Sequence, residues 1–363
     1  MRRLLRPLVP VQWRAPAVVE WVCLPNALFH AFPALAPRLC RVPLGEFPTP
    51  VERLPALDVW VKRDDRSGAP YGGNKVRKLE FLLADAIARG ARRIVTLCAF
   101  GSHHLLATTI YGRRAGLEVC GLVWPQPSTE HARDTLLLSA GAGACLHPAR
   151  NLAVLPFAMA GLGLRHRADR RVFIPPGGSS PLGALGYVAA ALELAEQVRA
   201  GALPPPDAIY VPFGSGGTAA GLAVGLRLAK LENARIFAVR VFDRLFTHAH
   251  GLAWLANRTA ALIRGAGGPD AGHFRARDFE VVHDQFGGAY GRETPAARAA
   301  LAAAASCGLT LETTYTAKAF AAVLARPKGS GRILFWNTFS SAPLDHRPRA
   351  ALDALPAGVQ RML

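Results

Sequence analysis

A lysine directly follows two glycines and an asparagine near residue 75. The stretch "GGNKVRKLEF" begins at Gly72 and places Lys75 behind residues with almost no side chain. Glycines let a flat ligand approach the backbone closely, so the Lys75 amine could reach the edge of such a ligand. The pKa of a lysine falls readily when the amine is desolvated or lies near another cation, and Arg77 and Lys78 are such neighbours. We therefore expect the Lys75 pKa to be lowered, and a neutral amine can form a Schiff base. The alternative, three solvated cations in the first turn of a helix, is disfavoured because cations there oppose the helix dipole.

A glycine-rich loop follows an apolar segment at residue 213. The string "FGSGGTAAG" spans residues 213–221, between a predicted strand and a predicted helix. Backbone N–H groups in such a loop, together with the helix N-terminus, bind phosphate. The same string fits the dinucleotide pattern G-x-G-x-x-A, with Asp243 as the ribose-binding acid, so a nicotinamide-dependent oxidoreductase stays open. A tight turn without a ligand is the third interpretation. The absence of a following Gly-Lys-Ser/Thr excludes a P-loop.

A third loop, "AFGSHHLLATT" at residues 99–109, also joins a predicted strand to a helix. Ser102 stands where it could cap that helix or, together with the helix N-terminus, receive a carboxylate. His103 and His104 are adjacent in sequence, and adjacent residues on a helix do not face the same way. We therefore expect no two-histidine metal site here, and none elsewhere in the chain.

The segments that must position these loops alternate between strand-like and helix-like patterns. Strands are predicted at 57–65, 93–100, 117–124, 208–213 and 235–243, and helices at 78–91, 103–116, 129–142, 187–201 and 219–233. A proline- and glycine-rich joint at 173–186 interrupts the series. Such alternation predicts crossover units on parallel sheets, where ligands bind at the carboxyl ends of the strands. All three loops have that position, so they predict one shared site.

Composition narrows the class of protein. A chain of 363 residues predicts two domains. It has no run of eighteen apolar residues, so we expect no membrane span. The formal charge of +18 comes largely from arginines scattered singly, without a basic helix carrying interleaved aromatics, so nucleic-acid binding is not expected. If it occurred, binding would weaken steeply with salt.

The cysteines and the N-terminal sequence indicate the cellular compartment in which the protein is expected. The six cysteines show no close pairing, so neither a disulfide framework nor a zinc site is predicted, and the reducing cytoplasm is the expected location. The arginine-rich start "MRRLLRPLVPVQWRAPAVV" contains prolines that break the amphipathic helix of a transit peptide. We interpret it as an N-terminal extension.

Taken together, a phosphate loop, a glycine-flanked lysine and a carboxylate loop indicate pyridoxal 5′-phosphate bound to a small amino acid. The chain also resembles the pyridoxal-phosphate enzymes of fold type II, in the branch with 1-aminocyclopropane-1-carboxylate deaminase and D-cysteine desulfhydrase. The motifs "GGNKVRKLEF", "GGSSPLGALGYV", "GSGGTAAGL", "TTYTAKAF" and "FWNTFSS" carry the resemblance in this order. It implies a tryptophan synthase β-like α/β fold of two open, twisted parallel sheets with helices on both faces. The large, cofactor-binding domain would comprise residues 1–78 and 191–363, and the small inserted domain residues 79–190. A homodimer is also implied.

The resemblance assigns roles to residues. Lys75 matches the lysine that holds the cofactor and moves the proton at the substrate's α-carbon, with Asn74 beside it at the cofactor. Ser102 matches a serine that meets the substrate carboxylate. Tyr290 and Tyr315 match active-site tyrosines, the first also expected at the substrate and the second at the cofactor. The phosphate loop consists of Gly214, Ser215, Gly216, Gly217 and Thr218.

One position departs from the family pattern. His103 stands where the family has an asparagine that binds the cofactor's ring hydroxyl. Imidazole can donate to the same oxygen, but it is bulkier and titrates near neutrality. We expect His103 to contact both cofactor and substrate, and His104 to contact the substrate.

Two threonines bear on the reaction. In the deaminase a glutamate follows the second tyrosine and protonates the pyridine nitrogen, and a leucine lies near the end of the final strand. This chain has Thr316 and Thr338 at those places. A hydroxyl leaves the cofactor a weaker electron sink, which favours β-elimination over opening a cyclopropane ring. The predicted activity is therefore D-cysteine desulfhydrase-like: a β-substituted amino acid gives pyruvate, ammonia and the leaving group. The alternatives are deaminase-like ring opening and a protein of this fold with altered or lost chemistry.

Overall fold

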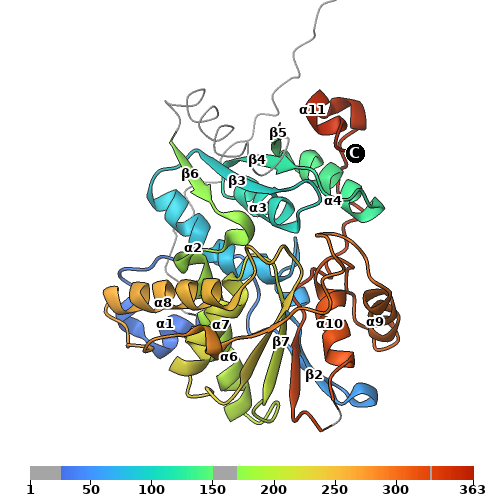
Figure 1. The fold of residues 1–363 in the computed structure, drawn as a ribbon. Helices are drawn as coiled ribbons and strands as arrows, with labels where there is room; N and C mark the ends of the chain where they lie inside the picture. The colour runs from blue at the N-terminus through green and yellow to red at the C-terminus, as the bar shows by residue number, and fades with distance from the viewer. Residues whose placement is uncertain (1–25, 150–169, 328) are drawn as a thin grey trace, which may run out of the picture.

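The computed structural model describes residues 26–149, 170–327 and 329–363, and within these ranges it contains two mainly parallel β-sheets (Figure 1). The larger sheet has the strand order β1-β2-β10-β7-β8-β9, and only its edge pair β1–β2 is antiparallel. Its strands are β1 (Val51–Leu54), β2 (Val59–Lys62), β7 (Ala208–Phe213), β8 (Arg235–Arg240), β9 (Glu280–Val282) and β10 (Ile333–Trp336).

The smaller sheet is parallel throughout, in the order β5-β4-β3-β6. Its strands are β3 (Arg93–Ala99), β4 (Glu118–Trp124), β5 (Cys145–Pro148) and β6 (Arg171–Ile174). Every residue of β3 after Arg93 is buried, which is typical of a central parallel strand that is covered on both faces.

Helices cover both faces of the larger sheet. α6 (Pro181–Arg199), α7 (Gly217–Leu228) and α8 (Ala249–Gly265) share one apolar core with the sheet, together with the short α1 (Ala27–Ala31). α9 (Pro295–Ala305) and α10 (Thr316–Leu324) close the opposite face. α2 (Asn74–Ala88), α3 (His103–Arg114) and α4 (Glu130–Gly141) build the core of the smaller sheet, which α11 (Ala357–Gln360) completes. The predicted fold of two parallel-sheet layers with crossover helices is present.

The predicted strands are present as β2, β3, β4, β7 and β8, whereas β1, β5, β6 and β9 were not predicted. Among the predicted helices, the largest difference is the start of α6. The helix begins at Pro181 and not at Tyr187, so it extends into the proline- and glycine-rich joint. Ser180 caps it by accepting a hydrogen bond from the Gly183 N–H, and proline is well suited to the first helical position. A Cβ atom on Gly186 would lie 2.2 Å from the backbone oxygen of Arg77. Glycine is thus required because α6 packs directly against the backbone of α2.

The packing also bears on the predicted domain boundaries. Position 78/79 lies inside α2 and position 190/191 inside α6, so each predicted boundary divides a helix. The C-terminal residues, expected in the large domain, instead pack on the smaller sheet: Leu355 and Val359 are buried in the same core as Leu146 of β5. The Ala350 N–H also donates to the Leu137 carbonyl of α4. The exact boundaries stay a prediction.

No helix within the described ranges is both long enough and apolar enough to cross a membrane. The predicted N-terminal extension lies outside the described residues.

Candidate active site

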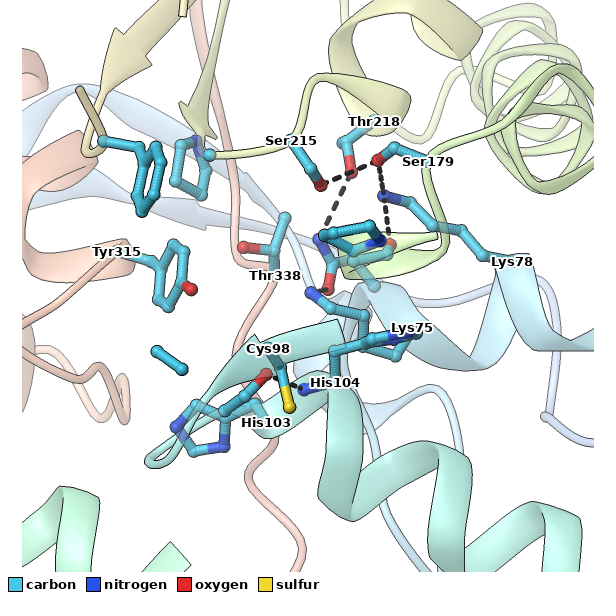
Figure 2. A pocket seen from close by; sticks show the side chains of 18 of the residues that line it. Lys75, Lys78, Cys98, His103, His104, Ser179, Ser215, Thr218, Tyr315 and Thr338 are labelled. Atoms are coloured by element: carbon cyan, nitrogen blue, oxygen red, sulfur yellow. Dashed lines mark hydrogen bonds between the residues drawn. The ribbon is translucent and has the colours of Figure 1, made fainter. Parts of the chain in front are cut away.

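A cavity of about 500 Å³ lies where strands of both sheets end. It is lined by every predicted site residue except Gly217, namely Asn74, Lys75, Ser102, His103, His104, Gly214, Ser215, Gly216, Thr218, Tyr290, Tyr315 and Thr338 (Figure 2). The three loops picked out in the sequence therefore meet at one place, although they come from three different strand–helix junctions.

Lys75 is the second residue of α2. Its Nζ donates to Asn74 Oδ1 at 2.6 Å. Removal from water lowers the pKa of Lys75 to about 8, although the nearby Glu312 carboxylate opposes this shift. Of the two causes expected, desolvation is the one that acts, whereas Arg77 is paired with Asp64 and Glu193. Burial, rather than the neighbouring cations, makes the amine easier to deprotonate.

The two glycines before Lys75 serve protein packing. A Cβ atom on Gly72 would lie 2.1 Å from the Asp65 backbone oxygen, and one on Gly73 would lie 2.5 Å from the Phe339 oxygen. Gly73 also has a φ of +85°, in the region that favours glycine. These glycines therefore seat the start of α2 against the end of the sheet, which fixes the direction of Lys75. Gly72 also lines the cavity, and its close approach to a flat ligand stays a prediction.

The glycine-rich loop leads from β7 into α7, whose first residue is Gly217. Gly216 adopts the left-handed φ of +85° that allows the loop to turn into the helix. Ser179 closes the loop: its Oγ accepts the Gly217 N–H at 3.0 Å and lies 2.7 Å from Ser215 Oγ. The helix N-terminus and these hydroxyls form a polar cradle for an anion.

Lys78 supplies the cation of this cradle. Its Nζ donates to the Gly177 carbonyl at 3.2 Å and lies 3.5 Å from Ser179 Oγ. Figure 2 shows Lys75 and Lys78 both reaching toward the side of the cavity where Ser179 and Ser215 lie. Burial, and then the charge of Lys75, hold the pKa of Lys78 well below its usual value. An anion bound here would supply the missing counter-charge. Lys78 follows Lys75 by three residues, a spacing that places both on one helix face, so its position near the site can be predicted from the sequence. Ser179 could be recognised only through its motif "GGSSPLG".

Ser102 is the N-cap of α3, since its Oγ accepts the His104 N–H at 3.2 Å. Of the two interpretations of this residue, the cap is therefore present in the structure. Its hydroxyl and the helix N-terminus still face the cavity, as the carboxylate-binding role requires. Cys98 also lines the cavity, but burial raises the pKa of its thiol to about 12, so it is not a nucleophile at neutral pH.

The two adjacent histidines point in different directions, as predicted. His104 has both ring nitrogens near threonines, with Nε2 3.0 Å from Thr96 Oγ1 and Nδ1 3.4 Å from Thr108 Oγ1. These contacts give no support to its predicted contact with substrate. His103 Nδ1 lies 2.5 Å from the Tyr71 hydroxyl.

A third histidine, not predicted from the sequence, joins this group. His131 comes from α4, and its Nε2 lies 2.8 Å from Nε2 of His103. Both nitrogens of His103 are therefore engaged, and binding a cofactor oxygen would require one of these bonds to be exchanged. No local motif marks His131, because only the packing of α4 beside α3 brings it to the site.

Tyr290 and Tyr315 form a pair, joined by a hydrogen bond between their hydroxyls. Their rings lie 5.9 Å apart, nearly edge to face. Burial raises the pKa of both hydroxyls, so both are protonated at neutral pH. A Cβ atom on Gly214 would lie 3.2 Å from the Tyr315 ring. Glycine at this position lets the ring pack over the start of the phosphate loop.

Thr316 and Thr338 both line the cavity, but Thr316 is tied to a carboxylate. Its Oγ accepts the Glu312 N–H at 3.0 Å and donates to Glu312 Oε1 at 3.2 Å. The same carboxylate accepts the N–H groups of Thr314, Tyr315 and Thr316 at 2.7, 2.8 and 2.8 Å, the last of which is the first residue of α10. Glu312 is a cavity residue that the motifs missed.

Comparison with known proteins assigns the family. The sequence model described as pyridoxal-phosphate dependent enzyme matches residues 42–338. The chain belongs to this family. The predicted family and its cofactor are confirmed, and the family replaces the alternative of a nicotinamide-dependent oxidoreductase. Asp243, the ribose-binding residue in that alternative, instead accepts the Leu245 N–H within a turn.

Relatives of this pyridoxal-phosphate enzyme include different activities. The chain is 39% identical over 315 residues to nocardicin C-9′ epimerase from Nocardia uniformis subsp. tsuyamanensis, covering 84% of this chain and 93% of the relative. It is 33% identical over 325 residues to D-cysteine desulfhydrase from Klebsiella pneumoniae, covering 83% and 94% respectively. Epimerisation is not among the reactions that the motifs predict.

A solved structure confirms the fold class. The crystal structure of an ACC deaminase homologue superimposes with a TM-score of 0.73 at 31% identity, covering 88% of this chain and 97% of that one. This pyridoxal-phosphate enzyme thus has the predicted fold type II.

The residues present fit the cofactor. The cradle of α7, Ser179, Ser215 and Lys78 suits its phosphate, and Lys75 offers an amine with a pKa of about 8 to its aldehyde.

Proposed function

We propose that this enzyme removes the α-proton of a small β-substituted amino acid and eliminates the β-substituent, as a D-cysteine desulfhydrase does. The observation that carries the proposal is Lys75, an amine with a pKa of about 8 that shares one cavity with a phosphate cradle and a carboxylate-binding helix start. A base whose pKa lies near the working pH is best suited to transfer a proton at carbon.

Each group has a part in this reaction. Pyridoxal phosphate, when bound, withdraws electrons from the α-carbon and makes its proton acidic. Lys78 and the Gly214–Thr218 loop anchor the phosphate, and Ser102 with the start of α3 orients the substrate carboxylate. Lys75 takes the α-proton. The protonated Tyr290–Tyr315 pair can donate a hydrogen bond to the departing group.

The hydroxyls of Thr316 and Thr338 support elimination over ring opening. No carboxylate directly occupies either of the two matched positions, and the nearby Glu312 carboxylate is already bonded to backbone N–H groups and to Thr316. A hydroxyl at these positions would leave the bound cofactor a weaker electron sink than a direct glutamate contact would. A weaker sink is sufficient for a reaction in which a good leaving group departs.

Epimerisation is a second candidate, because the relative from Nocardia carries that name and because the cavity residue His103, in contact with His131, is a further proton-carrying group. Both reactions begin with removal of the α-proton. They differ in whether the carbon is then protonated again or loses its β-substituent.

One assay separates these reactions. Purified enzyme in D₂O receives D-cysteine or L-cysteine, while pyruvate is measured by a coupled assay and α-deuterium by NMR. Elimination predicts pyruvate from one enantiomer. Deuterium incorporation with inversion and without pyruvate would favour epimerisation. Lys75→Ala is the control and should abolish both. If wild-type enzyme with bound cofactor gives neither product from cysteine, serine or their β-substituted derivatives, the proposal is wrong.

Two further proposals concern the assembly and the compartment. A homodimer is proposed from the family resemblance, and analytical ultracentrifugation tests it. Function in the cytoplasm is proposed because the cysteines show no disulfide framework. Fractionation of the producing cells tests this second proposal.

A further inference from the structure

A group of two cysteines and one histidine lies outside the cavity, on the smaller sheet. Cys120 belongs to β4, and Cys145 and His147 belong to β5. Cys120 and Cys145 are direct partners in the parallel register of the two strands. Because side chains alternate along a strand, Cys145 and His147, two residues apart, project from the same face.

The spacing of these side chains suits a metal ion. The two Sγ atoms and one imidazole nitrogen all lie within 4.8 Å of one another. Cys145 Sγ lies 3.3 Å from His147 Nε2. In a tetrahedral zinc site, ligand atoms about 2.0 to 2.3 Å from the metal lie roughly 3.5 Å from each other. Small rotamer changes would therefore bring the three atoms to coordinating distance.

The group is separate from the active site. Cys120 and Cys145 stand near the beginning of their strands, whereas Ala99 and Trp124, which line the cavity, end β3 and β4. Cys120 is buried in an apolar cluster with Val95 and Leu122, while Cys145 is exposed. One ligand is thus fixed in the sheet and another is open to solvent, which provides a route of entry.

We propose that Cys120, Cys145 and His147 bind a thiophilic cation such as Zn²⁺, with the fourth position open to water. Two thiolates would balance the charge of the ion, and sulfur with imidazole is a ligand set that zinc prefers. The sequence predicted no metal site because 24 residues separate the two cysteines and only the sheet register joins them.

The ion would have a structural effect. Among the described residues, β5 is an edge strand of four residues that pairs only with β4. A metal bound across the two strands would tie this edge to the sheet. Because the ion binds the folded arrangement, it would also raise the midpoint of thermal unfolding.

Cobalt substitution tests the proposal directly. The holoenzyme, with its cysteine thiols kept reduced, saturated with pyridoxal phosphate and free of metal, is titrated with Co²⁺ and then with Zn²⁺. We expect about one equivalent of Co²⁺ to give the sulfur-to-metal charge-transfer and visible bands of a tetrahedral thiolate site, which Zn²⁺ then removes. Zn²⁺ should also raise the thermal midpoint.

Variants locate the ion. Cys145→Ser, at the exposed ligand, should weaken Co²⁺ binding by more than about tenfold, since loss of even an outer-shell partner typically costs that much. It should also remove the thermal shift. His147→Gln should weaken binding while keeping a thiolate band. The matched control, Cys307→Ser, changes a cysteine outside the group and should bind like wild type.

Three results would overturn the proposal. The first is the absence of a thiolate band in wild type at millimolar Co²⁺. The second is unchanged Co²⁺ affinity in a folded Cys145→Ser variant. The third is loss of binding in His131→Gln but not in Cys145→Ser, because His103, His131 and Glu312 form a second cluster with suitable spacing and would then hold the ion.

Discussion

At the scale of single residues, the unusual feature of this protein is an amine that loses its proton more easily than lysine normally does. The pKa of Lys75 is lowered to about 8, chiefly by burial. A depressed pKa enlarges the fraction of neutral amine at physiological pH, and the neutral amine is the nucleophile. The chemistry of the site thus begins with the desolvation of one side chain.

Attachment of the cofactor should follow this pKa. In protein freed of pyridoxal phosphate, we expect the rate of covalent attachment to rise with pH through about 8 and then level off. Stopped-flow absorbance measures the rate, and borohydride trapping with mass spectrometry identifies Lys75. Free Nα-acetyl-lysine is the control, because its rate should keep rising toward a pKa of about 10.4. A midpoint near 10 in the protein would contradict the prediction.

The His103–His131 contact should set the acid side of the activity profile. Burial first, then His131, then Lys75 lower the pKa of His103 well below its usual value, so His103 is neutral near pH 7. Its protonation would place a cation beside Lys75. His131→Gln removes one cause of the lowering, so the His103 pKa rises and the acid limb of kcat/KM moves to higher pH.

The pH dependence of kcat/KM in both proteins checks this prediction. His273→Asn, at an exposed position remote from the cavity lining, serves as the matched control and should leave the limb in place. If the acid limb of His131→Gln stays in place or moves to lower pH, the contact with His131 does not control the pKa of His103.

The residues also show what sequence patterns can reveal about this site. Lys75, Ser102 and the glycine loop stand in loops of recognisable chemistry, so their meeting could be predicted. His131 and Glu312 could not be found in the same way, because their local sequence patterns are ordinary. Glu312 lines the cavity from the segment before α10, and His131 of α4 contacts the cavity residue His103. Desolvation of Lys75 was one of two expected causes of its lowered pKa, and its weight against the neighbouring cations depends on burial in the whole cavity.

At the scale of elements, the position of Lys75 depends on how closely α6 approaches α2. Alternating apolar patterns were sufficient to predict β2, β3, β4, β7 and β8 and the helices α2, α3, α4, α6 and α7, but not the short strands β1, β5, β6 and β9. They placed the start of α6 too late, because a segment rich in glycine and proline resembles a loop. The glycines there instead allow two helix backbones to touch, which is a tertiary effect that local propensity cannot express.

Gly186→Ala tests this helix contact. The new Cβ atom would lie 2.2 Å from the Arg77 oxygen, so α2 and α6 must separate. Overpacking of this kind typically costs about 1 to 3 kcal/mol in the free energy of unfolding, and here it should also weaken cofactor retention because α2 carries Lys75. Guanidinium unfolding and dialysis of the cofactor measure the two effects.

Gly265→Ala is the matched control for this substitution. Gly265 is likewise helical, as the last residue of α8, but a Cβ atom there would meet nothing within 4 Å. We expect unchanged stability or a gain of up to about 1 kcal/mol, because alanine reduces the entropy of the unfolded chain. Equal destabilisation by both substitutions would contradict the prediction, because alanine has the higher helix propensity and only Gly186 lies against another backbone.

At the scale of the whole molecule, a buried ionic cluster ties the larger sheet to the helix that carries Lys75. Glu193 of α6 lies 2.5 Å from Lys62 Nζ of β2 and 2.9 Å from Arg77 Nη1 of α2. Asp64 completes the cluster with Arg77 at 2.8 Å. Although burial alone would raise it, the two cations lower the pKa of Glu193 to about 2.

Removing this carboxylate should be costly. Glu193→Gln leaves Lys62 and Arg77 partly uncompensated, and loss of one partner from a buried pair typically costs about 3 to 5 kcal/mol. Chemical unfolding at pH 7 measures this cost. Glu196→Gln is the control, because that carboxylate is on the same helix but is 42% exposed, and its change should stay within about 0.5 kcal/mol.

The same carboxylate should contribute to acid unfolding. Because its folded pKa lies below its ordinary value of 4.5, its stabilising contribution is present above that pH and is lost as the pH falls toward about 2. The free energy of unfolding should therefore fall less steeply between pH 5 and 2 in Glu193→Gln than in wild type. Parallel curves for the two proteins would contradict this assignment.

The C-terminal segment has a consequence for how the molecule is made. A ribosome adds Leu355 and Val359, which pack in the core of the smaller sheet, long after it has made β3 and β4. During translation these two strands are therefore present for some time with part of their apolar core uncovered. Partly exposed apolar surface of this kind is prone to aggregation, so the nascent chain is vulnerable until the segment with Leu355 and Val359 has been made.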